Sequence, residues 1–143
     1  METDAVERST KSRRRWGGAE LVAVLAGVFF LASGLWAMVS PEGFFDAAAP
    51  FDPFNAHLIR DVGAFMVGLG ALLLLAAARF AADALAVALC GAGIGAVAHT
   101  LSHVVDRHHG GTPAVDIPVW TLLSLVLLWS GVTRWRHGKT NVS

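Results

Sequence analysis

The stretch that decides the fold of this chain is ALAVALCGAGIGAVAHTLSHVV, residues 84–105. It carries no Asp, Glu, Lys or Arg, and an α-helix needs about 20 apolar residues to cross about 30 Å of hydrocarbon. Its apolar residues run continuously, whereas a membrane β-strand would alternate apolar and polar side chains. Because a segment inside lipid must satisfy its own backbone hydrogen bonds, we expect this stretch to be a transmembrane helix.

Three further stretches have the same character. We predict spans over about 19–39, 57–79, 83–105 and 117–134, a basic and largely disordered tail over 1–18, a transmembrane domain over 19–134 and a second tail over 135–143. The chain is 55% hydrophobic with a mean hydropathy of +0.56, which is too apolar for an ordinary soluble domain. The predicted fold is all-α: a polytopic membrane protein, built as an antiparallel four-transmembrane-helix bundle whose second and third spans form a hairpin.

The basic residues orient this bundle, because loops rich in Lys and Arg stay in the cytoplasm. On the predicted outer side lie only Arg60 and Arg107. On the inner side lie Arg8, Lys11, Arg13, Arg14, Arg15, Arg79, Arg134, Arg136 and Lys139. We therefore expect a multi-pass protein of a bacterial cytoplasmic (inner) membrane, with both termini cytoplasmic.

Local signals refine the helix ends. The arginines before the first apolar run resemble a secretory or twin-arginine signal, but the run is longer than a signal core, which favours an uncleaved signal anchor. Ser40-Pro41-Glu42 predicts a helix start in the first outer loop. Asn55 is expected to cap the second span, and Asp116, followed by Pro118, the fourth.

Several function classes find no support in the composition. The formal net charge is zero, so nothing indicates nucleic acid as a partner. The single cysteine, Cys90, rules out an intrachain disulfide and a cysteine zinc site, and we expect it to be a small core residue. Phosphate-loop and dinucleotide motifs are missing. The spans carry no continuous charged path, which argues against transport by a monomer.

Histidines and aspartates gather toward the outer face. At about 1.5 Å rise per residue, Asp61 stands about 27 Å from the inner ends of the spans, and His99 and His103 about 24 and 30 Å. His57 precedes Asp61 by one helical turn, and Asp106 follows His103 by three residues. Buried ionisable groups are costly in a membrane unless they are paired, so we expect this layer to face inward.

Helical phase assigns the layer to one helix contact. Gly91, Gly95, His99 and His103 recur every four residues and form one stripe. On the second span, the face of His57 and Asp61 continues through Ala64, Gly68 and Ala71. Small residues mark helix contacts in membranes. We therefore predict that the polar layer lies between the second and third spans.

Imidazoles one turn apart together with a carboxylate suit a divalent transition metal. The hypothetical metal ligands are His57, Asp61, His99, His103 and Asp106. Three other interpretations stay open: a hydrogen-bonded network that fixes helix register, a proton-responsive gate, and haem ligation. Arg60 and Arg107 are interpreted as structural or lipid-headgroup partners. His108 and His109 are interpreted either as part of a solvated loop or as auxiliary metal ligands.

A resemblance adds to this prediction. With Arg60-Asp61-Val62-Gly63 opening a Gly-rich span after the loop Pro41-Glu42-Gly43-Phe44-Phe45, the chain resembles small four-span bacterial membrane proteins of unknown function that are loosely DoxX-like. The resemblance covers roughly residues 19–134 and implies a four-helix inner-membrane fold without an activity. DoxX-like proteins are associated with redox membrane complexes, yet this chain lacks the paired cysteines of a thiol redox centre.

Two hypotheses for the function follow. The first is a non-enzymatic subunit or partner-binding protein in the lipid bilayer, whose His/Asp cluster is structural or binds a metal. The second is a small metal- or haem-dependent membrane redox enzyme. Gly-rich helix faces also predict binding to a protein partner or to a second copy of the chain as a homodimer.

Overall fold

The computed structural model describes residues 16–79 and 82–140. The described residues form five helices: α1 (Gly18–Val39), α2 (Pro41–Ala48), α3 (Ala56–Arg79), α4 (Ala82–Val105) and α5 (Pro113–Thr140). Four of these are long and apolar enough to cross a membrane, over Gly18–Val39, Ala56–Ala78, Ala84–Val105 and Pro113–His137. The all-α, four-helix membrane bundle is thereby confirmed. The prediction of disorder for the N-terminal tail falls mostly outside the described residues.

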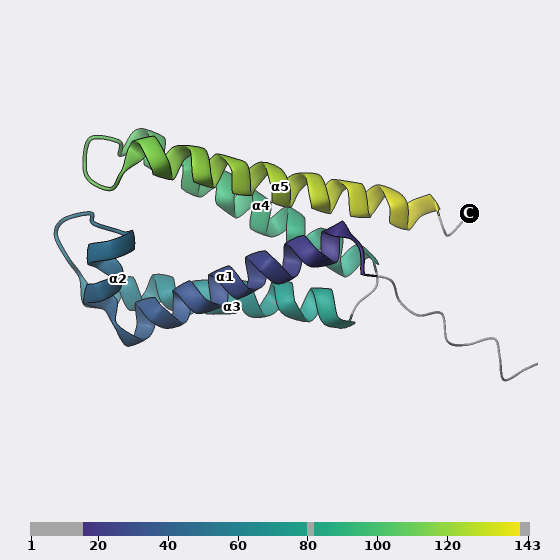
Figure 1. Cartoon of the computed structure of the whole chain (residues 1–143), viewed down its shortest axis with the longest axis horizontal. Helices are drawn as coiled ribbons and strands as arrows, with labels where there is room; N and C mark the ends of the chain where they lie inside the picture. The colour runs from purple at the N-terminus through teal and green to yellow at the C-terminus, as the bar shows by residue number, and fades with distance from the viewer. Residues whose placement is uncertain (1–15, 80–81, 141–143) are drawn as a thin grey trace, which may run out of the picture.

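The four long helices form two antiparallel pairs (Figure 1). The helix α1 packs along α3, and α4 packs along α5, while the contacts between the two pairs are much fewer. One end of the bundle, here called the terminal end, holds the start of α1 and the end of α5. The opposite end, the loop end, holds α2 and the connections 49–55 and 106–112.

Glycines bring α1 and α3 into backbone contact. A Cβ on Gly70 of α3 would lie 2.6 Å from the backbone N of Leu31 and 2.7 Å from the carbonyl O of Gly27. Seven residues after Gly27 on α1, a Cβ on Gly34 would lie 2.6 Å from the carbonyl O of Gly63. Small residues permit such close approach where lipid supplies no hydrophobic drive for association. These glycines therefore set the spacing of the α1–α3 pair.

The α4–α5 pair also has one glycine at a close contact on each helix. A Cβ on Gly93 would lie 2.7 Å from Cγ of Leu128, and one on Gly131 would lie 2.6 Å from Sγ of Cys90. Cys90 is partly buried at this helix contact. The thiol is thus a packing group between α4 and α5.

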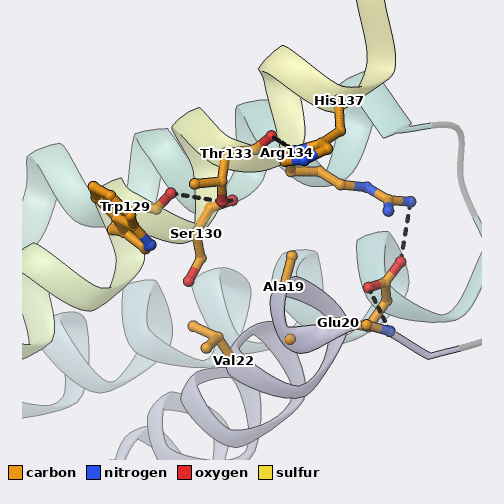
Figure 2. A pocket seen from close by; sticks show the side chains of 10 residues that line it. Ala19, Glu20, Val22, Trp129, Ser130, Thr133, Arg134 and His137 are labelled. Atoms are coloured by element: carbon orange, nitrogen blue, oxygen red, sulfur yellow. Dashed lines mark hydrogen bonds and ion pairs between the residues drawn. The ribbon is translucent and has the colours of Figure 1, made fainter. Parts of the chain in front are cut away.

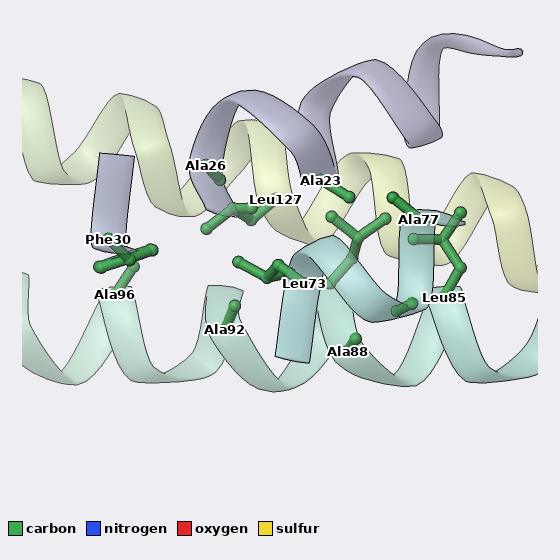
Figure 3. Packing of buried hydrophobic residues seen from close by; sticks show 12 residues of the cluster. Ala23, Ala26, Phe30, Leu73, Ala77, Leu85, Ala88, Ala92, Ala96 and Leu127 are labelled. Atoms are coloured by element: carbon green, nitrogen blue, oxygen red, sulfur yellow. The ribbon is translucent and has the colours of Figure 1, made fainter. Parts of the chain in front are cut away.

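Small apolar side chains fill the space between the two pairs (Figure 3). The buried cluster combines alanines with a few larger residues from all four spans. Its labelled members are Ala23, Ala26, Phe30, Leu73, Ala77, Leu85, Ala88, Ala92, Ala96 and Leu127. Large apolar side chains such as Phe65 and Trp129 lie on the outside, 81% and 74% exposed. An apolar exterior over helices of this length is what contact with lipid requires.

The structure confirms two of the three predicted helix starts. The short helix α2 begins at Pro41, as the Ser40-Pro41-Glu42 signal indicates. Asn55 caps α3, because its Oδ1 accepts hydrogen bonds from the backbone N–H groups of His57 and Leu58 at 3.0 and 3.1 Å. The prediction for the fourth span was wrong: α5 begins at Pro113, so Pro118 lies inside it. Pro113 suits a first helical position because the N–H that proline lacks has no helical partner there.

The Asn55 cap gives a testable expectation. Asn55→Ala removes the acceptor for two orphan N–H groups and should lower the free energy of unfolding by about 1 kcal/mol. Asn55→Asp keeps an acceptor in the same place and should stay close to wild type. Thermal unfolding in detergent would compare the variants, and equal stability of the two would show that the cap contributes nothing.

Candidate functional site

The helix α4 brings His99 and His103 together at the loop end of the bundle. The two residues are one turn apart, and their Nε2 atoms lie 3.1 Å from each other. The rings are nearly perpendicular, with centroids 4.7 Å apart and an interplanar angle of 77°. His99 and His103, two members of the predicted stripe, are therefore in direct contact through their side chains.

The surroundings of this pair come from α5 and from the loop after α2. The carboxylate Oδ2 of Asp116 lies 3.8 Å from Nδ1 of His103, whose side chain is only 11% exposed. The indole ring of Trp120 lies edge-on to His99 with centroids 4.2 Å apart. Phe51 packs edge-on against His103 at 5.8 Å. We call these five residues the loop-end cluster.

The turn before α5 holds Asp116 in place. Its Oδ2 accepts a hydrogen bond from the backbone N–H of Thr112 at 2.7 Å, closing the start of the helix. Gly111 has a φ of +69°, and a Cβ there would lie 2.9 Å from both Oδ2 of Asp116 and Cζ of Phe51. The backbone N–H of Gly111 also donates to the carbonyl of Pro50 at 3.3 Å. Only glycine combines this conformation with this close approach.

The remaining predicted ligands lie elsewhere. His57 and Asp61 face each other on α3, with Nε2 and Oδ2 3.5 Å apart and side chains 87% and 54% exposed. Asp106 pairs with His109, and the distance from Oδ1 of Asp106 to Nδ1 of His109 is 3.6 Å. Within residues 16–79 and 82–140, no group of three or more His, Cys, Asp or Glu side chains is arranged to hold a metal ion. The structure thus divides the five predicted ligands among separate pairs.

The helix pairing explains this division. We predicted the polar layer between the second and third spans, whereas His99 and His103 meet α5 and the loop around Phe51. The glycines of α3 that make close contacts, Gly63 and Gly70, meet α1. Of the two arginines, Arg107 donates to the carbonyl of Val104 at 3.2 Å near the end of α4, and Arg60 is exposed on α3.

A second polar site lies at the terminal end, where Glu20 of α1 meets Arg134 of α5 (Figure 2). Oε1 of Glu20 lies 3.0 Å from an Nη of Arg134, and the Glu20 side chain is only 2% exposed. Its other oxygen, Oε2, accepts a hydrogen bond from the backbone N–H of Gly17 at 3.0 Å. The ion pair therefore joins the two helix pairs at this end.

A cavity of about 330 Å³ opens beside the ion pair, lined by polar groups of α5 and by the first turn of α1. Thr133 uses its hydroxyl to bond the carbonyl of Trp129 at 2.8 Å, and His137 contacts the carbonyl of Thr133 at 2.7 Å. The buried Nε of Arg134 finds no hydrogen-bond partner among the described residues. Most polar groups around the cavity are thus engaged with the chain itself.

The sequence analysis did not identify this site. Glu20 falls inside the first predicted span, over 19–39, but was given no role there, and Arg134 was used only to orient the bundle. A signal was present: a carboxylate inside a span needs a cation at the same depth. Arg134 meets this condition, since the first span begins and the fourth span ends at the same side.

Together these features define a class of protein, a polytopic α-helical membrane protein whose polar contacts cluster at the two ends of the bundle. Within this class, the chain belongs to the family described as "Domain of unknown function (DUF4345)", which matches residues 19–133. Searches of the curated proteins and of the solved structures returned no match.

Proposed function

We propose that this chain is a partner-binding subunit of a membrane assembly, and that it binds a neighbouring transmembrane helix through an open small-residue face of α4. In this proposal the terminal end faces the cytoplasm of a bacterial inner membrane, as the positive charges of both tails favour. The loop-end cluster, on the outer side, holds α4, α5 and the loop around Phe51 together.

The observation that carries the proposal is the contrast between two sets of glycines. Glycine in a helix interior costs about 1 kcal/mol relative to alanine, so its presence calls for a packing reason. The glycines at positions 27, 34, 63, 70, 93 and 131 have that reason within the chain, since a Cβ on each would meet packed atoms at 2.6–2.8 Å. A Cβ on Gly68, Gly91 or Gly95 would meet nothing within 4 Å.

Gly91 and Gly95 stand one turn apart on the exposed side of α4, and Ala98 is exposed on the same side. Residues four apart share a helix face, and small residues at that spacing let a second helix approach to backbone contact. A second copy of the chain is the first partner to test, because its α4 offers the same surface and a symmetric contact is the commonest way for identical chains to associate.

The test compares substitutions on two sides of α4. Two copies carrying different affinity tags are expressed together, and the fraction that co-purifies from mild detergent or nanodiscs is measured. Replacing both Gly91 and Gly95 by leucine should reduce co-purification at least tenfold while leaving thermal unfolding unchanged, because open space surrounds both positions.

Two controls make this result specific. Val97→Leu changes an exposed and already bulky side chain of α4 that stands two residues from Gly95, on another side of the helix, and should not affect association. Gly93→Leu, on the buried side, should lower stability instead. Association that survives the double substitution would contradict the proposed face, and a wild-type chain that is monomeric in lipid would contradict self-association.

A further inference from the structure

The geometry points to a binding site for one late first-row divalent transition metal ion, such as Cu²⁺ or Zn²⁺, between the Nε2 atoms of His99 and His103, with the Asp116 carboxylate as an outer partner. This inference is independent of the partner proposal. It differs from the five-ligand centre predicted from the sequence, because it excludes His57, Asp61 and Asp106 and adds a carboxylate from α5.

The separation of the two nitrogens fits a shared metal. Imidazole nitrogens bind zinc at about 2.0–2.1 Å, so two of them at a tetrahedral angle lie about 3.3 Å apart. The Nε2 atoms of His99 and His103 are 3.1 Å apart, and their rings turn these nitrogens toward one another. Histidines at this spacing on one helix are the arrangement that metalloproteases use to present two ligands on one face.

Asp116 favours the tautomer of the His103 ring that a metal needs. Its Oδ2, 3.8 Å from Nδ1 of His103, stabilises a proton on that nitrogen and leaves the lone pair of Nε2 available. Metal-bound histidines commonly have such a carboxylate behind them, and it increases ligand basicity. Its negative charge also lowers the cost of placing a divalent cation near the membrane.

Metal binding would replace one hydrogen bond and release no proton. With the His103 proton on Nδ1, the metal-free pair is joined by a hydrogen bond in which Nε2 of His99 donates to Nε2 of His103. On binding, the proton of the donor ring moves to its own Nδ1 by exchange with water, and both Nε2 lone pairs bind the ion. His99 is exposed, so water completes the remaining coordination positions. Nitrogen ligands of this type suit copper, zinc and nickel.

The other His-containing pairs do not share this geometry. His57 with Asp61 and His109 with Asp106 are more than half exposed on each side chain. Each of these pairs joins residues three or four apart in the sequence, whereas the loop-end cluster joins α4, α5 and the loop around Phe51. They serve as internal comparisons in the experiment.

The experiment titrates the full chain, purified in detergent on a tag without histidines, with CuCl₂ or ZnCl₂ alone. Wild-type protein should bind one ion per chain, and the Cu²⁺ form should show two nitrogen ligands in its electron paramagnetic resonance spectrum. At a free metal concentration a hundredfold above Kd, the folded state should be favoured about a hundredfold, which raises the unfolding temperature.

Variants then locate the site. His99→Ala and His103→Ala should each lose the stoichiometric ion, and His57→Ala and His109→Ala, from the two comparison pairs, should retain it. Asp116→Asn keeps an acceptor for the Thr112 N–H and should weaken binding about 10- to 100-fold. His99→Gln serves if His99→Ala does not fold. Wild-type protein that binds no ion at micromolar metal, or binding that persists in the His99 and His103 variants, would overturn the inference.

Discussion

Replacing Gly70 by alanine is expected to lower the free energy of unfolding by about 3 kcal/mol, whereas the same change at Gly68, two residues away, should be neutral or slightly stabilising. A Cβ at Gly70 would meet the backbone N of Leu31 at 2.6 Å and the carbonyl of Gly27 at 2.7 Å. Backbone atoms cannot rotate away as a flexible side chain does, so α1 and α3 must separate, and overpacking of this kind costs about 1–3 kcal/mol or more.

Gly68 is a matched control for this prediction. It lies in the same helix and would gain the same methyl group, yet a Cβ there meets nothing within 4 Å. Alanine should therefore contribute only its higher helix propensity, up to about 1 kcal/mol. Thermal or denaturant unfolding in one detergent would measure both variants. Similar effects of the two substitutions would contradict the close α1–α3 contact.

Glu20→Gln is expected to destabilise the chain by about 3 kcal/mol, because removing one partner of a buried ion pair leaves the other charge uncompensated. Glutamine keeps the size of the side chain and an oxygen that can accept from Gly17. The change therefore isolates the charge opposite Arg134. Since the Glu20 side chain is only 2% exposed, added salt should screen the interaction weakly.

A double-mutant cycle tests the pairing itself. Arg134→Gln combined with Glu20→Gln should recover part of the stability lost in either single variant, with a coupling energy of about 1–3 kcal/mol. Glu42→Gln, which alters an exposed carboxylate on α2, should leave stability within about 0.5 kcal/mol of wild type. A coupling energy near zero would show that the two residues do not depend on each other.

The sequence predicted the number and type of the spans well, because continuous apolar runs of the required length have few alternatives in a membrane protein. It also identified the His99 and His103 pair, since a separation of four residues on a helix determines a shared face whatever surrounds it. Both predictions depend on local geometry alone.

Which helix lies opposite a given face was harder to predict. Gly91, Gly93 and Gly95 are alternate residues of one helix, and their spacing offers two opposite small-residue faces. The four-residue period favoured Gly91 and Gly95, but within the chain Gly93 makes the close contact. In lipid, a small face can meet a neighbouring helix of the same chain, another chain or acyl chains, and hydrophobicity does not distinguish these cases.

Asp116 shows a related limit at the loop end. It was predicted to begin the fourth span, but the helix starts at Pro113, and its carboxylate closes the first turn while facing His103. That second role depends on how α4 and α5 pack, which the local sequence around Asp116 does not specify.

The pairing of helices has a consequence for how the chain is made. Each pair consists of successive spans, α1 with α3 and then α4 with α5, so every span finds its main packing partner immediately before or after it. Chains leave the ribosome from the N-terminus onward. The first hairpin can therefore close in the bilayer while the second is still being synthesised, and no span has to wait beside the translocation channel for a distant partner.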